Sequence, residues 1–168
     1  MTTTPPNFEI RNATKDDLLA LEWDGEYRIF RRLYRRAMNE AMQGRRILLV
    51  ADLEGRPIGQ IFIQLHTVPS DPLKLPKTGY FYSFRVRPEY RNMGIGSTLI
   101  SRAEGALRMR AFQRVLIGVA KDNQSALRLY QRLGYQIITE DPGEWSFVDH
   151  ENKVREIVEP TFILEKYL

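Results

Sequence analysis

The sequence predicts an α/β fold with a mixed, mostly antiparallel β-sheet flanked by helices. Segments that alternate between apolar and polar residues are interleaved with segments whose apolar residues recur every three or four positions. The 168 residues suffice for one core, and no repeat or linker divides them. The expected order is β-α-α-β-β-β-α-β-α-β-β. We therefore expect a single domain over residues 1–168, with residues 1–7 as a loose tail.

The amino-terminal part of the chain is expected to form one strand followed by two helices. Residues 8–13 alternate as a strand with one buried face does. Thr14, with Asp17 three residues later, can cap a helix that continues to about Trp23. Residues 27–43 carry apolar side chains every three or four positions, which predicts a second helix.

A hairpin and a loop are expected to follow the second helix. Gly44 ends that helix, because glycine readily adopts the left-handed conformation found just past helix ends. Residues 46–52 and 57–66 predict a β-hairpin with Gly55 at its turn. Residues 68–77 contain three prolines, and we expect them to form an extended loop.

The carboxy-terminal half is expected to alternate strands with helices. In chain order the elements are a strand at 79–86, a helix at 97–112, a strand at 114–120, a helix from about 125 to a stop at Gly134, and strands at 136–140 and 161–166. Between the last two strands we expect a turn at 141–144, an irregular excursion at 145–149 and a hairpin tip at 150–153.

The composition excludes several classes of protein. The chain has no cysteine, which excludes disulfides and thiolate metal sites, and its two histidines give no basis for a metal centre. It shows neither the layout of a signal peptide nor an apolar run of membrane-spanning length, so we expect a cytoplasmic protein that does not contact a membrane. The net charge of +4 suits a polyanionic small molecule as a partner.

The most informative motif is the loop that joins the strand of residues 79–86 to the helix of residues 97–112. Its sequence is Arg91-Asn92-Met93-Gly94-Ile95-Gly96. Where such a loop enters a helix, backbone N–H groups lack helical acceptors and can bind a phosphate or pyrophosphate. Glycines at two positions let the backbone approach the anion closely. The motif is not a dinucleotide fingerprint, because Leu99 replaces the third glycine, and the chain contains no Walker loop. Alone, it also fits a helix start that uses two glycines to turn.

A second motif follows the strand of residues 114–120 and has the form Asn-x-x-Ala-x-x-x-Tyr-x-x-x-Gly-Tyr. Its members are Asn123, Ala126, Tyr130, Gly134 and Tyr135. Together with the Arg-x-x-Gly-x-Gly loop, this motif resembles those of the GNAT superfamily of acyl-CoA-dependent N-acyltransferases. The resemblance extends over residues 79–135, about a third of the chain, and the order and interval of the two motifs agree with it.

The resemblance implies acetyl-CoA as the acyl donor, without a metal, and a sheet that opens between the strands of residues 79–86 and 114–120. The main chain of the first strand would contact the pantetheine arm. Asn123 would contact the same arm, a role compatible with capping the helix that follows it. The expected cofactor-binding residues are Phe84, Arg85, Val86, Arg91, Asn92, Met93, Gly94, Ile95, Gly96, Ser97, Asn123 and Tyr130.

Tyr130 is expected to be the general acid, because a phenol is a hydrogen-bond donor at neutral pH and this position matches the acid of the family. The alternative is a core aromatic that packs against neighbours at helical spacing. By the same resemblance, the region between the first two helices shapes the acceptor site. The expected acceptor-side residues are Trp23, Glu26, Tyr27, Phe30 and Tyr82.

The general base stays unassigned. Family members often carry a carboxylate on the strand before the phosphate loop, but residues 79–86 contain none. Ser83 could order a water molecule, and His66 titrates near neutral pH. Three acidic residues could act from the helix side, and each is equally typical of a solvated surface: Glu22, Asp24 and Glu26.

We therefore expect an acetyltransferase that moves an acetyl group from acetyl-CoA to a primary amine by direct transfer in a ternary complex, since no cysteine could carry the acyl group. A non-catalytic acyl-CoA sensor is one alternative. A protein that engages RNA through the arginine-rich helix face of Arg28–Arg36 is another, although that face also fits plain solvation and a nucleic-acid partner is not expected. The acceptor, the acyl chain length and a homodimer are left open.

Overall fold

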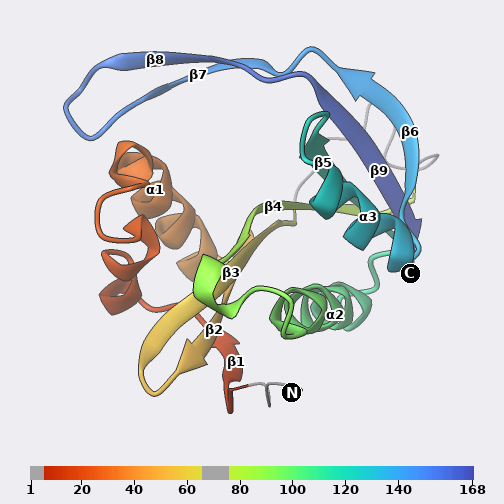
Figure 1. The fold of residues 1–168 in the computed structure, drawn as a ribbon, viewed down its shortest axis with the longest axis horizontal. Helices are drawn as coiled ribbons and strands as arrows, with labels where there is room; N and C mark the ends of the chain where they lie inside the picture. Colours follow the sequence, from red (N-terminus) through yellow and green to blue (C-terminus); the bar gives the residue numbers. More distant parts are fainter. Residues whose placement is uncertain (1–5, 66–75) are drawn as a thin grey trace.

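The computed structural model describes residues 6–65 and 76–168 and contains a seven-stranded mixed sheet (Figure 1). The strand order is β1-β2-β3-β4-β5-β9-β6, and β4 and β5 are the parallel pair, while the other neighbours are antiparallel. The bounds are β1 Glu9–Asn12, β2 Arg46–Leu53, β3 Arg56–Gln64, β4 Thr78–Val86, β5 Arg114–Ala120, β6 Gln136–Asp141 and β9 Thr161–Tyr167. The predicted fold class and its seven strands are confirmed.

Helices cover both faces of the sheet, and β3 is therefore buried on both sides. Ile61 and Ile63 of β3 belong to the core that includes α2 (Ile95–Arg108) and α3 (Gln124–Arg132). Phe62, between them, belongs to a second core with Tyr34 and Met38 of α1 (Arg31–Met42). Alternate side chains of a strand point to opposite faces, so α1 lies on one face and α2 with α3 on the other.

The predicted helix over residues 14–23 is wrong, because this segment forms two short 3-10 turns, Lys15–Asp17 and Ala20–Glu22. Leu21, Glu22 and Trp23 are all buried. One face of an α-helix cannot bury three consecutive residues. The segment ends at Trp23 with a left-handed φ of 48°, which no right-handed helix can continue.

The other helices differ from prediction at their ends. The helix expected at 27–43 starts with a 3-10 turn, Arg28–Phe30, before α1 begins, and Gly44 ends it with a φ of +78° as predicted. The helix α2 begins two residues before the expected Ser97, at Ile95, and the chain leaves the helix by Ala111, whose φ is 60°. The hairpin of β2 and β3 turns at Gly55 with a φ of +86°.

The expected irregular excursion at 145–149 is also wrong, because this segment is a regular strand. The strand β7 (Glu144–Val148) pairs antiparallel with β8 (Val154–Val158), with the tip at residues 150–153 as predicted. The alternation expected of a strand was obscured by apolar residues on exposed positions of both strands, Val148 of β7 and Val154 and Val158 of β8. In Figure 1 this long hairpin reaches from β6 and β9 across to α1.

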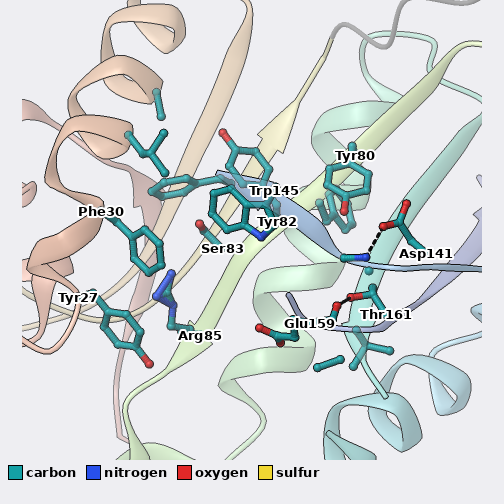
Figure 2. Close-up of a pocket in the computed structure, with 18 of the residues that line it drawn as sticks. Tyr27, Phe30, Tyr80, Tyr82, Ser83, Arg85, Asp141, Trp145, Glu159 and Thr161 are labelled. Atoms are coloured by element: carbon teal, nitrogen blue, oxygen red, sulfur yellow. Dashed lines mark hydrogen bonds between the residues drawn. The ribbon is translucent and has the colours of Figure 1, made fainter. Parts of the chain in front are cut away.

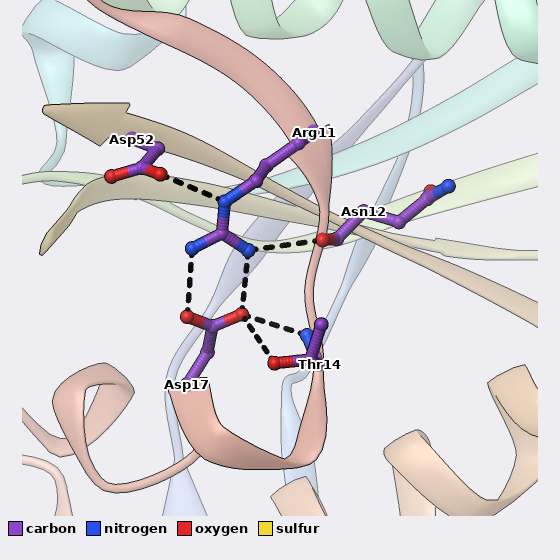
Figure 3. A network of polar contacts seen from close by, with 5 residues as sticks. All are labelled: Arg11, Asn12, Thr14, Asp17 and Asp52. Atoms are coloured by element: carbon purple, nitrogen blue, oxygen red, sulfur yellow. Dashed lines mark hydrogen bonds and ion pairs between the residues drawn. The ribbon is translucent and has the colours of Figure 1, made fainter. Parts of the chain in front are cut away.

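An ion-pair network joins β1 to β2 and to the first 3-10 turn (Figure 3). Arg11 donates to both carboxylate oxygens of Asp17, at 2.7 and 2.9 Å, and to Asp52 at 2.9 Å. Asp17 also accepts the backbone N–H of Thr14 at 2.7 Å. The hydrogen bond from Arg11 is the main reason that the pKa of Asp17 lies below its usual range. The predicted pairing of Thr14 with Asp17 is therefore present, but it starts a 3-10 turn rather than an α-helix.

Candidate active site

The site begins where β4 and β5 separate. These strands pair over only four residues each, and the last partners are Phe81 and Ile117. Beyond them, β4 continues beside β3 alone, and β5 continues beside β9 alone. The backbone groups that line the resulting gap are therefore not used for pairing between β4 and β5. This is the opening that the sequence resemblance implied.

A β-bulge in β4 directs its side chains at this gap. The register passes from Gln60 opposite Arg85 to Phe62 opposite Tyr82, which leaves two β4 residues facing one residue of β3. Ser83, in the bulge, adopts a left-handed φ of 49°. The bulge turns both Ser83 and Arg85 into a cavity.

The loop after β4 places free backbone donors beside the gap. Thr98 donates its backbone N–H to the carbonyl of Gly94 at 3.0 Å, which is the first bond of α2. The N–H groups of Ile95, Gly96 and Ser97 therefore precede the helical ladder. Arg91 ties the loop to the end of β4 through a 3.0 Å bond from Nε to the Val86 carbonyl.

The two glycines of the loop have different physical roles. Gly94 caps α2 with a φ of +83°, a conformation that favours glycine. A Cβ on Gly96 would lie 3.0 Å from Cζ of Phe84, so a side chain at this position would require the Phe84 ring to shift. The structure thus brings the predicted loop and Phe84 of β4 together at one place. Its donors and its open approach at Gly94 fit a pyrophosphate.

The second predicted motif lies on the other side of the gap. Asn123 caps α3, where its side chain accepts the N–H of Ala126 at 3.3 Å, and it also lines the cavity. Tyr130 of α3 is buried, with its ring centroid 6.1 Å from that of Phe84 and 6.2 Å from that of Tyr135. Burial raises the pKa of Tyr130, and nearby Tyr80 adds to the effect. Tyr130 therefore remains a protonated donor at neutral pH.

A cavity of about 960 Å³ extends from the gap toward α1. Among the predicted acceptor-side residues, Tyr27, Phe30 and Tyr82 line it (Figure 2). Trp23 does not line it and packs beneath Arg87, whose guanidinium lies 5.4 Å from the Trp23 ring. Glu26 is exposed and also lies outside the lining.

Several lining residues were not identified from the sequence. The β7–β8 hairpin brings Trp145 against Phe30 with ring centroids 6.5 Å apart. The segments that flank the hairpin bring Asp141, at the end of β6, and Glu159, between β8 and β9, to the cavity wall (Figure 2). These residues follow the second motif in sequence but belong to neither motif, and the pairing of β6 with β9 and of β7 with β8 places them here. The further lining residues missed in this way include Tyr34, Arg46 and Tyr80.

The candidate bases proposed from the sequence differ in burial and in their partners. Glu22 is buried and pairs with Arg31 at 2.8 Å, so it is not free to take a proton from a substrate. Asp24 is largely exposed, and its nearest basic group is Arg87 at 3.5 Å. Ser83 lines the cavity, whereas His66 lies outside the described residues.

The arginine-rich face of α1 is partly occupied by partners within the protein. Arg31 pairs with Glu22, Arg36 pairs with Glu40 at 3.3 Å, and Arg32 donates to Asn152 at the hairpin tip. This face therefore holds structural contacts to the loop before it and to the β7–β8 hairpin. Within the described ranges, no helix is long and apolar enough to cross a bilayer, and no group of His, Asp and Glu side chains is arranged to hold a metal ion.

Comparison with known proteins gives consistent matches. The model of the acetyltransferase (GNAT) family matches residues 15–135. An uncharacterized N-acetyltransferase of Methanocaldococcus jannaschii is 27% identical over 140 residues, a match that includes 77% of this chain but only 61% of that relative.

Solved structures share the fold. NAA60 of Arabidopsis thaliana, in complex with a bisubstrate analogue, superimposes with a TM-score of 0.73 at 16% identity, covering 96% of this chain and 99% of that one. The ribosomal-protein-alanine N-acetyltransferase of Brucella melitensis gives a TM-score of 0.68 at 19% identity, with 95% and 99% covered. At these identities the likeness concerns the fold alone.

Proposed function

The chain belongs to the GNAT acetyltransferase family, and from this premise we propose that it transfers an acetyl group from acetyl-CoA to a primary amine, with both bound in one ternary complex. The observation that carries the proposal is the gap between β4 and β5, which opens beside the free N–H groups at the start of α2. The loop could therefore hold a pyrophosphate while the neighbouring gap receives the thioester.

The loop, β4 and the start of α3 would each bind a different part of acetyl-CoA. The N–H groups of residues 95–97 bind the pyrophosphate, aided by the positive end of the α2 dipole. The main chain of residues 84–86, which β5 leaves unpaired, binds the pantetheine arm as an added strand would be bound. Asn123 contacts the same arm from the start of α3. When bound, acetyl-CoA supplies an acyl group activated as a thioester.

Tyr130 assists the departure of the thiolate. Its phenol keeps its proton well above neutral pH, because burial raises its pKa. A thiol has a pKa of about 8.5, below that of a phenol, so Tyr130 acts chiefly by donating a hydrogen bond as the sulfur acquires charge. The transfer is direct, since the chain contains no cysteine to carry the acyl group.

Calorimetric titration with acetyl-CoA tests the binding half of the proposal. We expect affinity of about micromolar strength for the wild-type protein and its loss in Gly96→Glu, because a carboxylate would enter the anion site and clash with Phe84. Gly105→Glu is the matched control, since Gly105 lies later in α2 and a Cβ there meets nothing within 4 Å. Folded wild-type protein that does not bind acetyl-CoA, or equal binding by Gly96→Glu, would refute this assignment.

A further inference from the structure

We propose that the acceptor is a free amino acid, and that Arg85 binds its carboxylate while the amine is directed to the gap between β4 and β5. This inference rests on the proposed acyl transfer and names its acceptor class. It follows from how charge is distributed over the cavity wall.

Arg85 is a cation held in place by aromatic side chains rather than by an acid. Its Nη2 donates to the Tyr34 hydroxyl at 2.9 Å, and its guanidinium carbon lies 3.9 Å from the Tyr27 ring centroid and 5.8 Å from that of Phe30. Among the described residues, no carboxylate lies within 4.0 Å of it. Figure 2 shows the side chain pointing into the cavity between Tyr27 and Phe30.

The other two arginines of the cavity wall share one acidic partner. Arg46 and Arg36 both pair with Glu40, and Arg46 also donates to the Tyr82 hydroxyl. Arg85 is thus the one lining cation, in the described part of the chain, that lacks an acidic partner. A guanidinium carries five N–H donors in a fixed fork, and only one is occupied by Tyr34. The remaining donors suit a carboxylate, which can bind two of them at once.

The opposite end of the cavity is acidic. Asp141 accepts the backbone N–H of Gly143 at 2.7 Å, and neither Asp141 nor Glu159 has a basic partner within 4.0 Å among the described residues. Thr161 donates its hydroxyl to the Glu159 carbonyl at 2.7 Å, and its methyl group would lie 3.2 Å from a Cβ on Gly118. The acidic end therefore adjoins β5 beyond its last pairing with β4 (Figure 2).

These two ends orient a zwitterion in one direction. An ammonium group is attracted to Asp141 and Glu159, which are exposed beside the gap, and a carboxylate to the half-buried Arg85 beneath α1, because each meets a group of opposite charge. A simple amine would leave Arg85 without a counter-ion among aromatic rings, which is unfavourable. The charge pattern thus selects an acceptor that carries both groups.

The walls also limit the size and character of the acceptor. Trp145 and Phe147 of β7 pack on Phe30, with centroid distances of 6.5 and 5.0 Å, and Trp145 lines the cavity next to α1. The space that remains must also receive the acyl end of the donor. Aromatic and aliphatic residues together make up more than half of the lining, which favours an acceptor with an apolar side chain.

Acetylation of each common amino acid, measured beside its carboxamide by free-thiol release, tests the proposal. Amidation removes the carboxylate charge but keeps the size and the amine. For the wild-type protein we expect the preferred free acids to have kcat/KM values ~10–100-fold above their amides, the range for a lost charge-assisted hydrogen-bond pair. Arg85→Gln should abolish this preference by raising KM for the acids. Arg35→Gln, which removes the same charge from an exposed position on α1 outside the cavity lining, should keep it.

The outcomes separate the two proposals. Equal kcat/KM for acids and amides in the wild-type protein would overturn the inference about Arg85 while leaving acetyl transfer intact. Preference for the amides of aspartate and glutamate would overturn the α-carboxylate in favour of a side-chain carboxylate, as in a peptide. Failure of every amine to release thiol would contradict the proposed function itself. Unchanged acetyl-CoA affinity in Arg85→Gln shows that the variant is folded. Arg85→Lys keeps the charge but loses the forked donors, so its preference for acids over amides should lie between those of the wild-type protein and Arg85→Gln.

Discussion

Replacing Gly96 and Gly105 with alanine in separate variants tests the packing of the loop at residues 91–96, because both glycines lie in α2. At Gly105 the new methyl group meets nothing within 4 Å. The variant should gain up to about 1 kcal/mol, the difference in helix propensity between alanine and glycine. At Gly96 the methyl group would lie 3.0 Å from Phe84 Cζ and 3.8 Å from a Leu129 methyl, whereas carbon atoms prefer about 3.5–4.0 Å.

Relieving that contact requires the Phe84 ring to rotate or α2 to shift. Such overpacking costs about 1–3 kcal/mol, which exceeds the gain in propensity. We therefore expect Gly96→Ala to destabilise the fold by about 1 kcal/mol, so that the two variants differ by about 2 kcal/mol with opposite signs.

Urea unfolding followed by circular dichroism measures both values. Phe84→Leu, which removes the contacting ring atom, should abolish the extra cost of Gly96→Ala in a double-mutant cycle. Equal stabilisation by both glycine replacements would refute the packing account of the loop, and so would a cycle with no coupling between residues 84 and 96.

Three further predictions concern the supports of the site. Asp17→Ala should lower the free energy of unfolding by about 2–3 kcal/mol in urea titrations, because it leaves Arg11 with a single acidic partner; a change near zero would contradict that role. The hydrogen bond from Arg155 is the main reason that the pKa of Asp149 is lowered from 3.8 to about 2. The stability that Asp149 contributes is therefore fully present above pH 3.8 and is lost as the pH falls through about 2. Asp149→Asn should flatten this acid limb in a fluorescence-monitored pH titration, and an unaltered limb would contradict the assignment. Trp145→Ala should raise KM for the acceptor ~10-fold, since Trp145 packs on Phe30, and should leave acetyl-CoA affinity unchanged in calorimetry. Weakened acetyl-CoA binding would contradict the assignment of Trp145 to the acceptor.

Features set by neighbouring residues could be predicted from the sequence. Gly44 and Gly55 occur where the backbone requires positive φ, and Asn123 caps α3 through a bond three residues away. Such signals can be recognised without knowing the rest of the fold, because each depends only on residues three or four positions apart in sequence. The glycines of the loop at residues 91–96 are a local signal of the same kind, because Gly94 adopts a φ of +83° at the start of α2.

Features set by tertiary contacts could not be predicted. The segment before α1 has helical spacing of leucines, but Glu22 is buried by its pairing with Arg31, nine residues away, and this competes with a regular helix. The excursion after residue 144 was missed as a strand because β7 pairs with β8 alone and leaves apolar side chains exposed.

The cavity next to α1, which we propose receives the acceptor, belongs to this second group. Arg85 was expected to contribute main-chain contacts only. Its side chain acquires a distinct environment because the bulge at Ser83 turns it toward α1, where Tyr27 and Tyr34 receive it. Neither the bulge nor these partners has a signal in the sequence of β4.

Amine-dependent release of free thiol from acetyl-CoA, compared between the wild-type protein and Tyr130→Phe, tests acyl transfer most directly. We predict release that requires an amine, with kcat ~10²-fold lower in Tyr130→Phe at nearly unchanged acetyl-CoA affinity, as for removal of a general acid. Because burial raises the pKa of Tyr130 above its ordinary value, its ionisation should not lower the wild-type rate below about pH 10. Binding of acetyl-CoA with no thiol release for any amine would contradict the account and identify a sensor instead.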